Sequence, residues 1–263
     1  MRSSQSPVAG IVSRDRAIVG TCILIVVVLA WAYLIRLDSQ MGSHESPLGS
    51  MPGMSMLPGA PQGYRELLLT FAMWSVMMVG MMTATAAPLI MLFAGMREKL
   101  GDPGASTKAM VLGLGYLTVW VSFSAAAALS QWGLQRELLL SSDMSVRSSV
   151  AAGLILIFAG VYQLTPAKRA CLRQCQSPLG FLMANWRDGT AGAFAMGLRH
   201  GLFCLGCCWA LMTVLFVVGI MNLAWVAVLT VVVLAEKLGR IGALVVRAGS
   251  VIMIGYGVMI LAT

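Results

Sequence analysis

Soft metal ligands gather in one apolar stretch of the chain, which contains Met196, His200, Cys204, Cys207 and Cys208. In an α-helix, with about 3.6 residues per turn, the first four of these fall on one face and Cys208 lies at its edge. Thioether, imidazole and thiolate groups suit Cu(I) or Zn(II), whereas hard cations prefer oxygen ligands. The pattern predicts a metal site with His200, Cys204, Cys207 and Cys208 as ligands, and it favours Cu(I) over Zn(II).

The same cysteines also have a purely structural interpretation. A cysteine in a transmembrane helix often packs as a small hydrophobic residue. The neighbouring Gly197, Gly201 and Gly206 predict close contact with another helix,. Metal or redox chemistry and a packing seam therefore both remain open, although three thiols so close to an in-phase histidine favour chemistry.

A second group of sulfur atoms lies in a Met-rich segment. Met73, Met77 and Met81 are four residues apart and share one helical face, with Met78 and Met82 beside it,. Such a stripe usually serves as packing. However, the stretch 37–63 contains five more soft ligands, so a copper-collecting loop is an equally open interpretation. Those five residues are Met41, His44, Met51, Met54 and Met56. We therefore include Met73, Met77, Met78 and Met81 among the candidate metal ligands.

Two further motifs are weaker. Cys171 and Cys175 lie in the predicted cytoplasmic loop 167–188, where nearby basic residues would favour thiolates,. Their spacing also fits two unrelated solvated cysteines. Glu236 and Lys237 end an apolar segment, and an ion pair or a capped helix end would explain both. Arg247 is another possible partner for Glu236.

The elements that must hold these residues are transmembrane helices. Of the 263 residues, 59% are hydrophobic and 11% are charged, well below the charge of a soluble domain,. The net charge of +8 is therefore not a sign of nucleic-acid binding. We predict an all-α, polytopic transmembrane helix bundle of about seven spans. The predicted spans are 17–36, 67–94, 109–132, 149–166, 191–220, 223–239 and 243–262.

Most Lys and Arg residues fall on one side if the spans alternate, which predicts that the N-terminus is inside,. The predicted organisation is a basic cytoplasmic N-terminus (1–16), a first transmembrane span (17–36), an outer loop with Met and His (37–66) and a six-span membrane bundle (67–263). The expected location is a bacterial inner, or plasma, membrane. The expected partners are the lipid bilayer, a metal ion and another membrane protein.

The segment 197–212, with its Cys-Cys-Trp block, resembles the DUF2182 proteins, as do Trp225, Glu236 and Lys237 further on. The stretch 73–82, with Pro88 beyond it, is similar to their other shared segment, although Thr83 stands where many relatives carry Pro. The resemblance covers about 66–262. It implies a bacterial polytopic membrane protein that binds metal, and it implies no particular reaction.

The leading functional hypothesis is a membrane protein that handles Cu(I) in transport, delivery or tolerance. The first alternative is a membrane thiol oxidoreductase, or an accessory or assembly subunit of a membrane metalloenzyme. The second is a cysteine cluster that only packs helices together. The sequence favours a protein that is not itself an enzyme.

Overall fold

The computed structural model describes residues 7–42, 63–136, 148–220 and 222–262, and these residues form helices without any β-strand. Ten helices follow one another within these ranges. They are α1 (Pro7–Gly42), α2 (Tyr64–Lys99), α3 (Ala105–Arg136), α4 (Ser149–Leu164), α5 (Pro166–Gln176), α6 (Pro178–Asn185), α7 (Gly189–Thr213), α8 (Leu215–Val218), α9 (Leu223–Glu236) and α10 (Gly239–Ala262). The predicted all-α class is confirmed.

Five of these helices are long and apolar enough to cross a membrane, namely α1, α2, α3, α7 with its continuation α8, and α10. The pair α4 and α5 would make a sixth span, bent by 63°, and α9 is a shorter apolar helix. A multi-pass helical membrane protein is therefore confirmed. The full count of seven spans and the inward N-terminus remain predictions.

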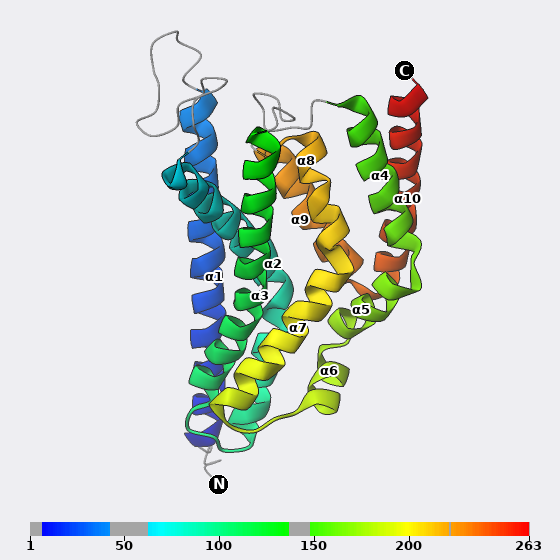
Figure 1. Ribbon diagram of the computed structural model, residues 1–263. Helices are drawn as coiled ribbons and strands as arrows, with labels where there is room; N and C mark the ends of the chain where they lie inside the picture. Colours follow the sequence, from blue (N-terminus) through cyan, green and yellow to red (C-terminus); the bar gives the residue numbers. More distant parts are fainter. Residues whose placement is uncertain (1–6, 43–62, 137–147, 221, 263) are drawn as a thin grey trace.

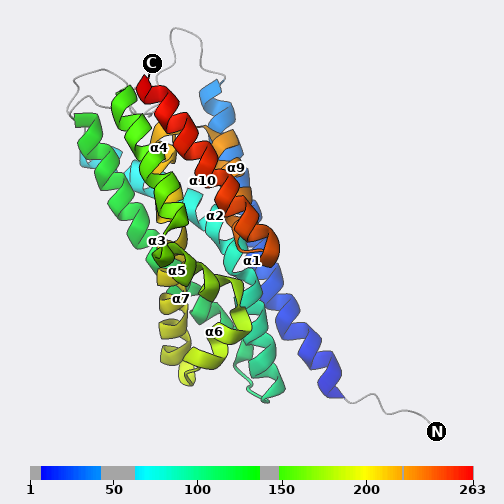
Figure 2. The ribbon, with the colours of Figure 1, turned by 90° about the vertical axis from the view of Figure 1, so that its right-hand side faces the viewer.

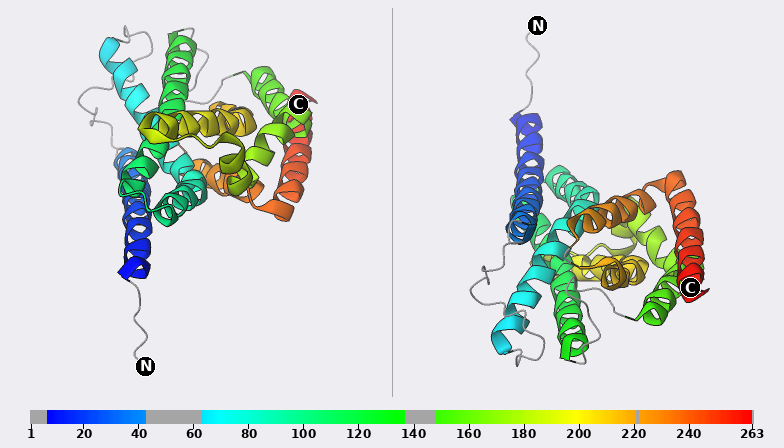
Figure 3. Two further views of the ribbon diagram at one scale, coloured as in Figure 1. Left: turned by 90° about the horizontal axis from the view of Figure 1, so that it is seen from below. Right: turned by 90° about the horizontal axis from the view of Figure 1, so that it is seen from above.

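The helices form an elongated bundle with the two chain ends at opposite ends (Figure 1). Viewed along its length, α1, α2 and α3 lie on one side, α4 and α10 lie on the other, and α7 and α9 run between them (Figure 3). The bend between α4 and α5 and the turn between α9 and α10 both lie part-way along the bundle, not at its ends (Figures 1 and 2). The bend and the turn both approach the middle of α7.

The first helix extends beyond its predicted span. The sequence predicts that this span ends at residue 36, but α1 continues to Gly42. Hydropathy locates the apolar part of a helix, and the backbone can continue its hydrogen-bonded spiral into water. The Met/His stretch of the predicted loop 37–66 falls largely on residues 43–62, which lie outside the described residues, so the copper-collecting loop remains a prediction.

Glycines set the separation of α3 and α7. A methyl group added at Gly197 would overlap the Leu112 carbonyl oxygen, and one at Gly115 would overlap the Phe194 carbonyl oxygen. At Gly201 the added carbon would lie 2.9 Å from a Val119 methyl group. Small residues therefore let the two backbones approach closely, as is common between membrane helices. This confirms the contact predicted at Gly197 and Gly201.

Gly197→Ala is expected to lower the free energy of unfolding by about 3 kcal/mol, because the added methyl group meets rigid backbone,. The measurement is thermal or denaturant unfolding of the purified protein in detergent. Gly249→Ala in α10 is the matched control, since no atom lies within 4 Å of its added carbon. Equal losses in both variants would contradict the proposed tight crossing.

The turn between α2 and α3 is held by charged residues. Arg97 is buried and pairs with Asp102 at 3.5 Å and with Asp188 at 3.0 Å. The Lys108 ammonium lies 2.6 Å from the Asp102 carboxylate, and the Gly104 amide donates to the same side chain. The Lys108 hydrogen bond, helped by the Gly104 amide and the charge of Arg97, lowers the pKa of Asp102 below its usual 3.8.

Because the folded state lowers the pKa of Asp102, this carboxylate stabilises the fold above its unfolded pKa. That stabilisation is expected to be lost as the pH falls below about 4 and passes through the folded-state pKa. Melting temperatures measured from pH 6 to pH 3 should therefore fall less steeply in Asp102→Asn than in the wild type. An identical slope in the two proteins would contradict this account of Asp102.

Candidate metal centre

Three cysteine sulfurs meet in the middle of the bundle. Cys175 of α5 and Cys204 and Cys207 of α7 are all buried, and their Sγ atoms lie within 4.8 Å of one another. They are the only group of three or more His, Cys, Asp or Glu residues this close together among the described residues. All described cysteines are free thiols. The arrangement brings two of the predicted ligands together with a cysteine that is distant in sequence.

The approach of α5 to α7 depends on Gly206. A side-chain carbon at this position would lie 2.8 Å from the Cys171 Sγ. The Tyr162 hydroxyl, at the end of α4, donates a 2.5 Å hydrogen bond to the Gly206 carbonyl. Thr165 caps α5 by accepting from the Lys168 amide, so the chain turns directly from α4 into α5,. Together these contacts lay α5 on α7 and place Cys175 at the cluster.

One cation and one phenol touch the Cys204 sulfur. The Lys237 Nζ lies 3.1 Å from the Cys204 Sγ and donates a 2.7 Å hydrogen bond to the Thr85 hydroxyl. The Tyr116 hydroxyl lies 3.1 Å from the same sulfur and 3.1 Å from the Met82 carbonyl oxygen. Cys204 is therefore the most polar of the three thiol positions.

The thiols of Cys207 and Cys208 both donate a hydrogen bond to a backbone carbonyl group about one turn earlier in α7. Their Sγ atoms donate to the Cys204 carbonyl oxygen at 3.1 Å and 2.9 Å. Cys208 is buried but is not one of the three sulfurs within 4.8 Å of one another. It borders the cluster, as its position at the edge of the helical face predicted.

His200 also lies outside the three-sulfur group. Its ring packs against Tyr116 and Phe181, with centroid distances of 5.8 Å and 4.9 Å. The Nδ1 atom is buried without a hydrogen-bond partner. Met196, on the same predicted face, accepts a hydrogen bond from the Arg187 amide at 3.3 Å instead. Of the four residues that helical phase places on one face of α7, Cys204 and Cys207 join the three-sulfur group, whereas Met196 and His200 have other partners.

The Met stripe of α2 runs through the core towards this site. Met78 and Met81 are fully buried, whereas Met73 and Met77 border a small cavity near α1 and α9. Nearer the cluster, α2 contributes the Met82 carbonyl oxygen and the Thr85 hydroxyl, which contact Tyr116 and Lys237. Polar groups therefore join α2 to the thiols, because Tyr116 and Lys237 each contact α2 on one side and the Cys204 sulfur on the other.

Beside the cluster lies a second set of buried charges. Lys168 and Glu236 are each 1% exposed and form an ion pair at 2.7 Å. Gln163 donates to the other Glu236 oxygen at 2.9 Å and accepts a hydrogen bond from Lys168. Gln176 donates to the Glu236 backbone carbonyl at 2.8 Å. The end of α9 is therefore fixed to α4 and α5.

These contacts correct the interpretation of Glu236 and Lys237. Glu236 pairs with Lys168, not with Lys237 or Arg247, and Lys237 turns towards Cys204. Adjacent residues on a helix point in directions about 100° apart, so two neighbours readily face different partners. Most of the predicted loop 167–188 forms the helices α5 and α6.

Sequence reasoning gave low weight to Cys175 and missed Tyr116 and Lys237 as site residues. Two signals were available in the sequence. One is Lys237 at the end of an apolar segment, since a lysine in the membrane generally has a specific partner; the other is the pair Cys171 and Cys175. Neither signal indicates which helix its side chain faces.

The fold and the cluster together define a multi-pass membrane protein with a buried, thiol-rich site suited to a soft metal ion. The chain belongs to the PpoB2 family, which is described as a copper chaperone family and matches residues 71–260. Comparisons with curated proteins and with solved structures gave no match. The matched range contains the Met stripe and the three-sulfur cluster, so the chain is a copper-related membrane protein.

Proposed function

We propose that this protein binds Cu(I) as cargo at Cys175, Cys204 and Cys207 and delivers it to a partner protein. The observation that carries the proposal is the convergence of three buried thiols from two helices. Thiolates are soft ligands that select Cu(I). The family description supports delivery over the other roles considered, transport and tolerance.

The sulfur positions are close to those that one ion requires. Thiolate sulfurs bound to a single metal at about 2.3 Å can be at most about 4.6 Å apart. The three Sγ atoms are already within 4.8 Å of one another. Small side-chain rotations would therefore complete the site without movement of α5 or α7.

The ligand set supports Cu(I) more than Zn(II). A structural zinc site normally has four ligands in a closed tetrahedron. Among the described residues, the group holds three thiols, and His200 and Cys208 lie outside it. His200 and Cys208 remain candidate ligands next to the group, and Met73, Met77, Met78 and Met81 remain candidate ligands along the path of the ion.

Lys237 supplies the countercharge for a bound ion. One Cu(I) bound by two thiolates carries a net charge of −1, and one Cu(I) bound by three thiolates carries −2. An unpaired negative charge is costly in an apolar interior. The ammonium group 3.1 Å from the Cys204 Sγ would offset part of this charge.

The proposal also includes the arrangement of the chain in the membrane. We retain an inward N-terminus, seven spans and a bacterial inner membrane, because the Lys and Arg distribution favours this orientation. The resemblance to DUF2182 proteins supports the same proposal, since that group is described as metal-binding and integral to the membrane.

The test is the stoichiometry of Cu(I) binding to the purified full-length protein. We expect about one tightly bound Cu(I) per wild-type chain and none in the Cys175→Ser/Cys204→Ser/Cys207→Ser variant, because hydroxyl groups are poor ligands for a soft ion. Cys22→Ser, in α1 and outside the three-sulfur group, is the control and should bind as the wild type does. Unchanged binding in the triple variant would disprove the proposed site.

The close approach of the thiols also supports a thiol oxidoreductase as a second candidate. A disulfide needs an S–S bond of about 2.05 Å, which the cluster would reach by side-chain rotation. Thiol trapping in cells separates the two functions. A redox cycle leaves an oxidised fraction that shifts with added reductant, whereas a Cu(I) site leaves thiols that metal alone protects.

A further inference from the structure

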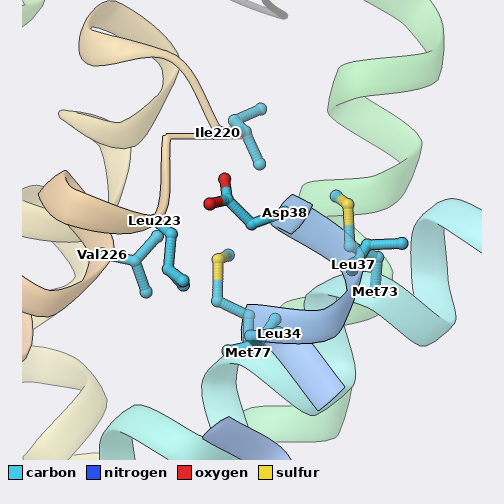
Figure 4. A pocket seen from close by; sticks show the side chains of 8 residues that line it. All are labelled: Leu34, Leu37, Asp38, Met73, Met77, Ile220, Leu223 and Val226. Carbon is cyan, nitrogen blue, oxygen red and sulfur yellow. The ribbon is translucent and has the colours of Figure 1, made fainter. Parts of the chain in front are cut away.

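A small cavity lies between α1, α2 and the start of α9, towards the end of the bundle where α1 ends (Figure 4). Its volume is about 20 Å³, which is room for one water molecule or one small ion,. The walls are apolar apart from one carboxylate, Asp38, and two thioethers, Met73 and Met77. In Figure 4 the Asp38 carboxylate and the Met77 sulfur point into the same space, next to Leu223.

This combination of groups suits a soft monovalent cation. A thioether is a soft, neutral ligand that binds Cu(I) weakly. A carboxylate adds negative charge that attracts any cation to the opening of the cavity. Asp38 is exposed, so the cavity opens to the surface of the bundle at its position. Weak ligation is useful where an ion must also leave, because a receiving site has to release what it captures.

One face of α2 leads from this cavity to the thiol cluster. Met77, Met81 and Thr85 succeed one another at intervals of four residues and so lie along the same side of the helix,. With a rise of 1.5 Å per residue, Met77 and Thr85 are about 12 Å apart along the axis. Met81 is fully buried between them. Thr85 contacts Lys237, which in turn contacts the Cys204 sulfur.

We propose that this cavity is a receiving site for Cu(I), from which the ion passes along the thioethers of α2 to the cysteines. The inference rests on the proposed function, since it assigns the path by which the cargo reaches the cluster. The ion moves by ligand exchange and stays Cu(I) throughout. A metal–thioether bond breaks as a metal–thiolate bond forms, and each thiol that binds the ion releases its proton to water.

The experiment measures how fast Cu(I) is loaded, separately from how much is bound. Full-length protein in lipid nanodiscs is mixed with a coloured Cu(I)–chelator complex, and the loss of colour is followed over time. Met73→Leu/Met77→Leu should load about tenfold more slowly than the wild type and reach the same final stoichiometry. Met→Leu conserves volume, so the fold should persist, and thermal unfolding checks this.

Met91→Leu is the matched control, because Met91 lies on the same helix but on its exposed side. It should load at the wild-type rate. Asp38→Asn should slow loading at low ionic strength and less so at high ionic strength, where the attraction is screened. A wild-type rate in the double Met variant would overturn the receiving site, and a wild-type rate for Asp38→Asn at low salt would overturn the role of the carboxylate.

A second measurement tests binding at the cavity directly. In the Cys175→Ser/Cys204→Ser/Cys207→Ser background, Ag(I), which is a soft ion without redox chemistry, should still bind weakly. Adding Met73→Leu/Met77→Leu should weaken that binding, and Ag(I) binding of unchanged strength would contradict the inference. Failure of the proposed function looks different, because tight Cu(I) binding would then persist in the triple Ser variant itself.

Discussion

Lys237→Gln is expected to weaken Cu(I) binding by about 10- to 100-fold, which corresponds to the loss of a hydrogen bond between charged groups. The substitution removes the ammonium that lies 3.1 Å from the Cys204 sulfur, while glutamine can still hydrogen-bond to Thr85. Competition between the protein and a Cu(I) chelator of known affinity gives the dissociation constant. The stoichiometry should stay at that of the wild type, because all three thiols remain.

Lys99→Gln is the control for this prediction, since Lys99 is exposed at the end of α2 and carries the same charge. Its affinity should match that of the wild type. Equal affinities in the Lys237→Gln and wild-type proteins would show that the ammonium does not offset the charge of the bound ion.

Breaking the buried ion pair should produce a large loss of stability. Lys168→Met leaves the Glu236 carboxylate buried without its cation, and Glu236→Gln leaves the Lys168 ammonium without its anion. Removing one partner of a buried pair typically lowers the free energy of unfolding by about 3–5 kcal/mol. Denaturant titration in detergent measures this quantity for each variant.

The double variant Lys168→Met/Glu236→Gln provides the control. It leaves no uncompensated charge, and we expect it to recover most of the stability lost in either single variant. The amide that Glu236→Gln introduces can still hydrogen-bond to Gln163. Additive losses in the double variant would contradict the ion-pair account.

Because Glu236 precedes Lys237, the single variants should also weaken Cu(I) binding by loosening the turn between α9 and α10.

Composition and local pattern determined the class of this protein and predicted part of its candidate site. Long apolar stretches dictate helices because the backbone must satisfy its hydrogen bonds internally in lipid. The 3.6-residue period then places Cys204 and Cys207 on one face of α7, and both join the cluster. The glycines of the same helix correctly predicted its close packing, since only small residues let two backbones approach.

Only the tertiary structure decided which distant residues complete the site. Cys175 reaches the cluster because α4 bends by 63° into α5 and α5 rests on Gly206. Lys237 reaches Cys204 because the turn after α9 lies part-way along the bundle, where Lys168 fixes Glu236. Helical periodicity specifies the direction of a side chain around its own axis, but the partner it meets depends on how helices far apart in sequence pack together.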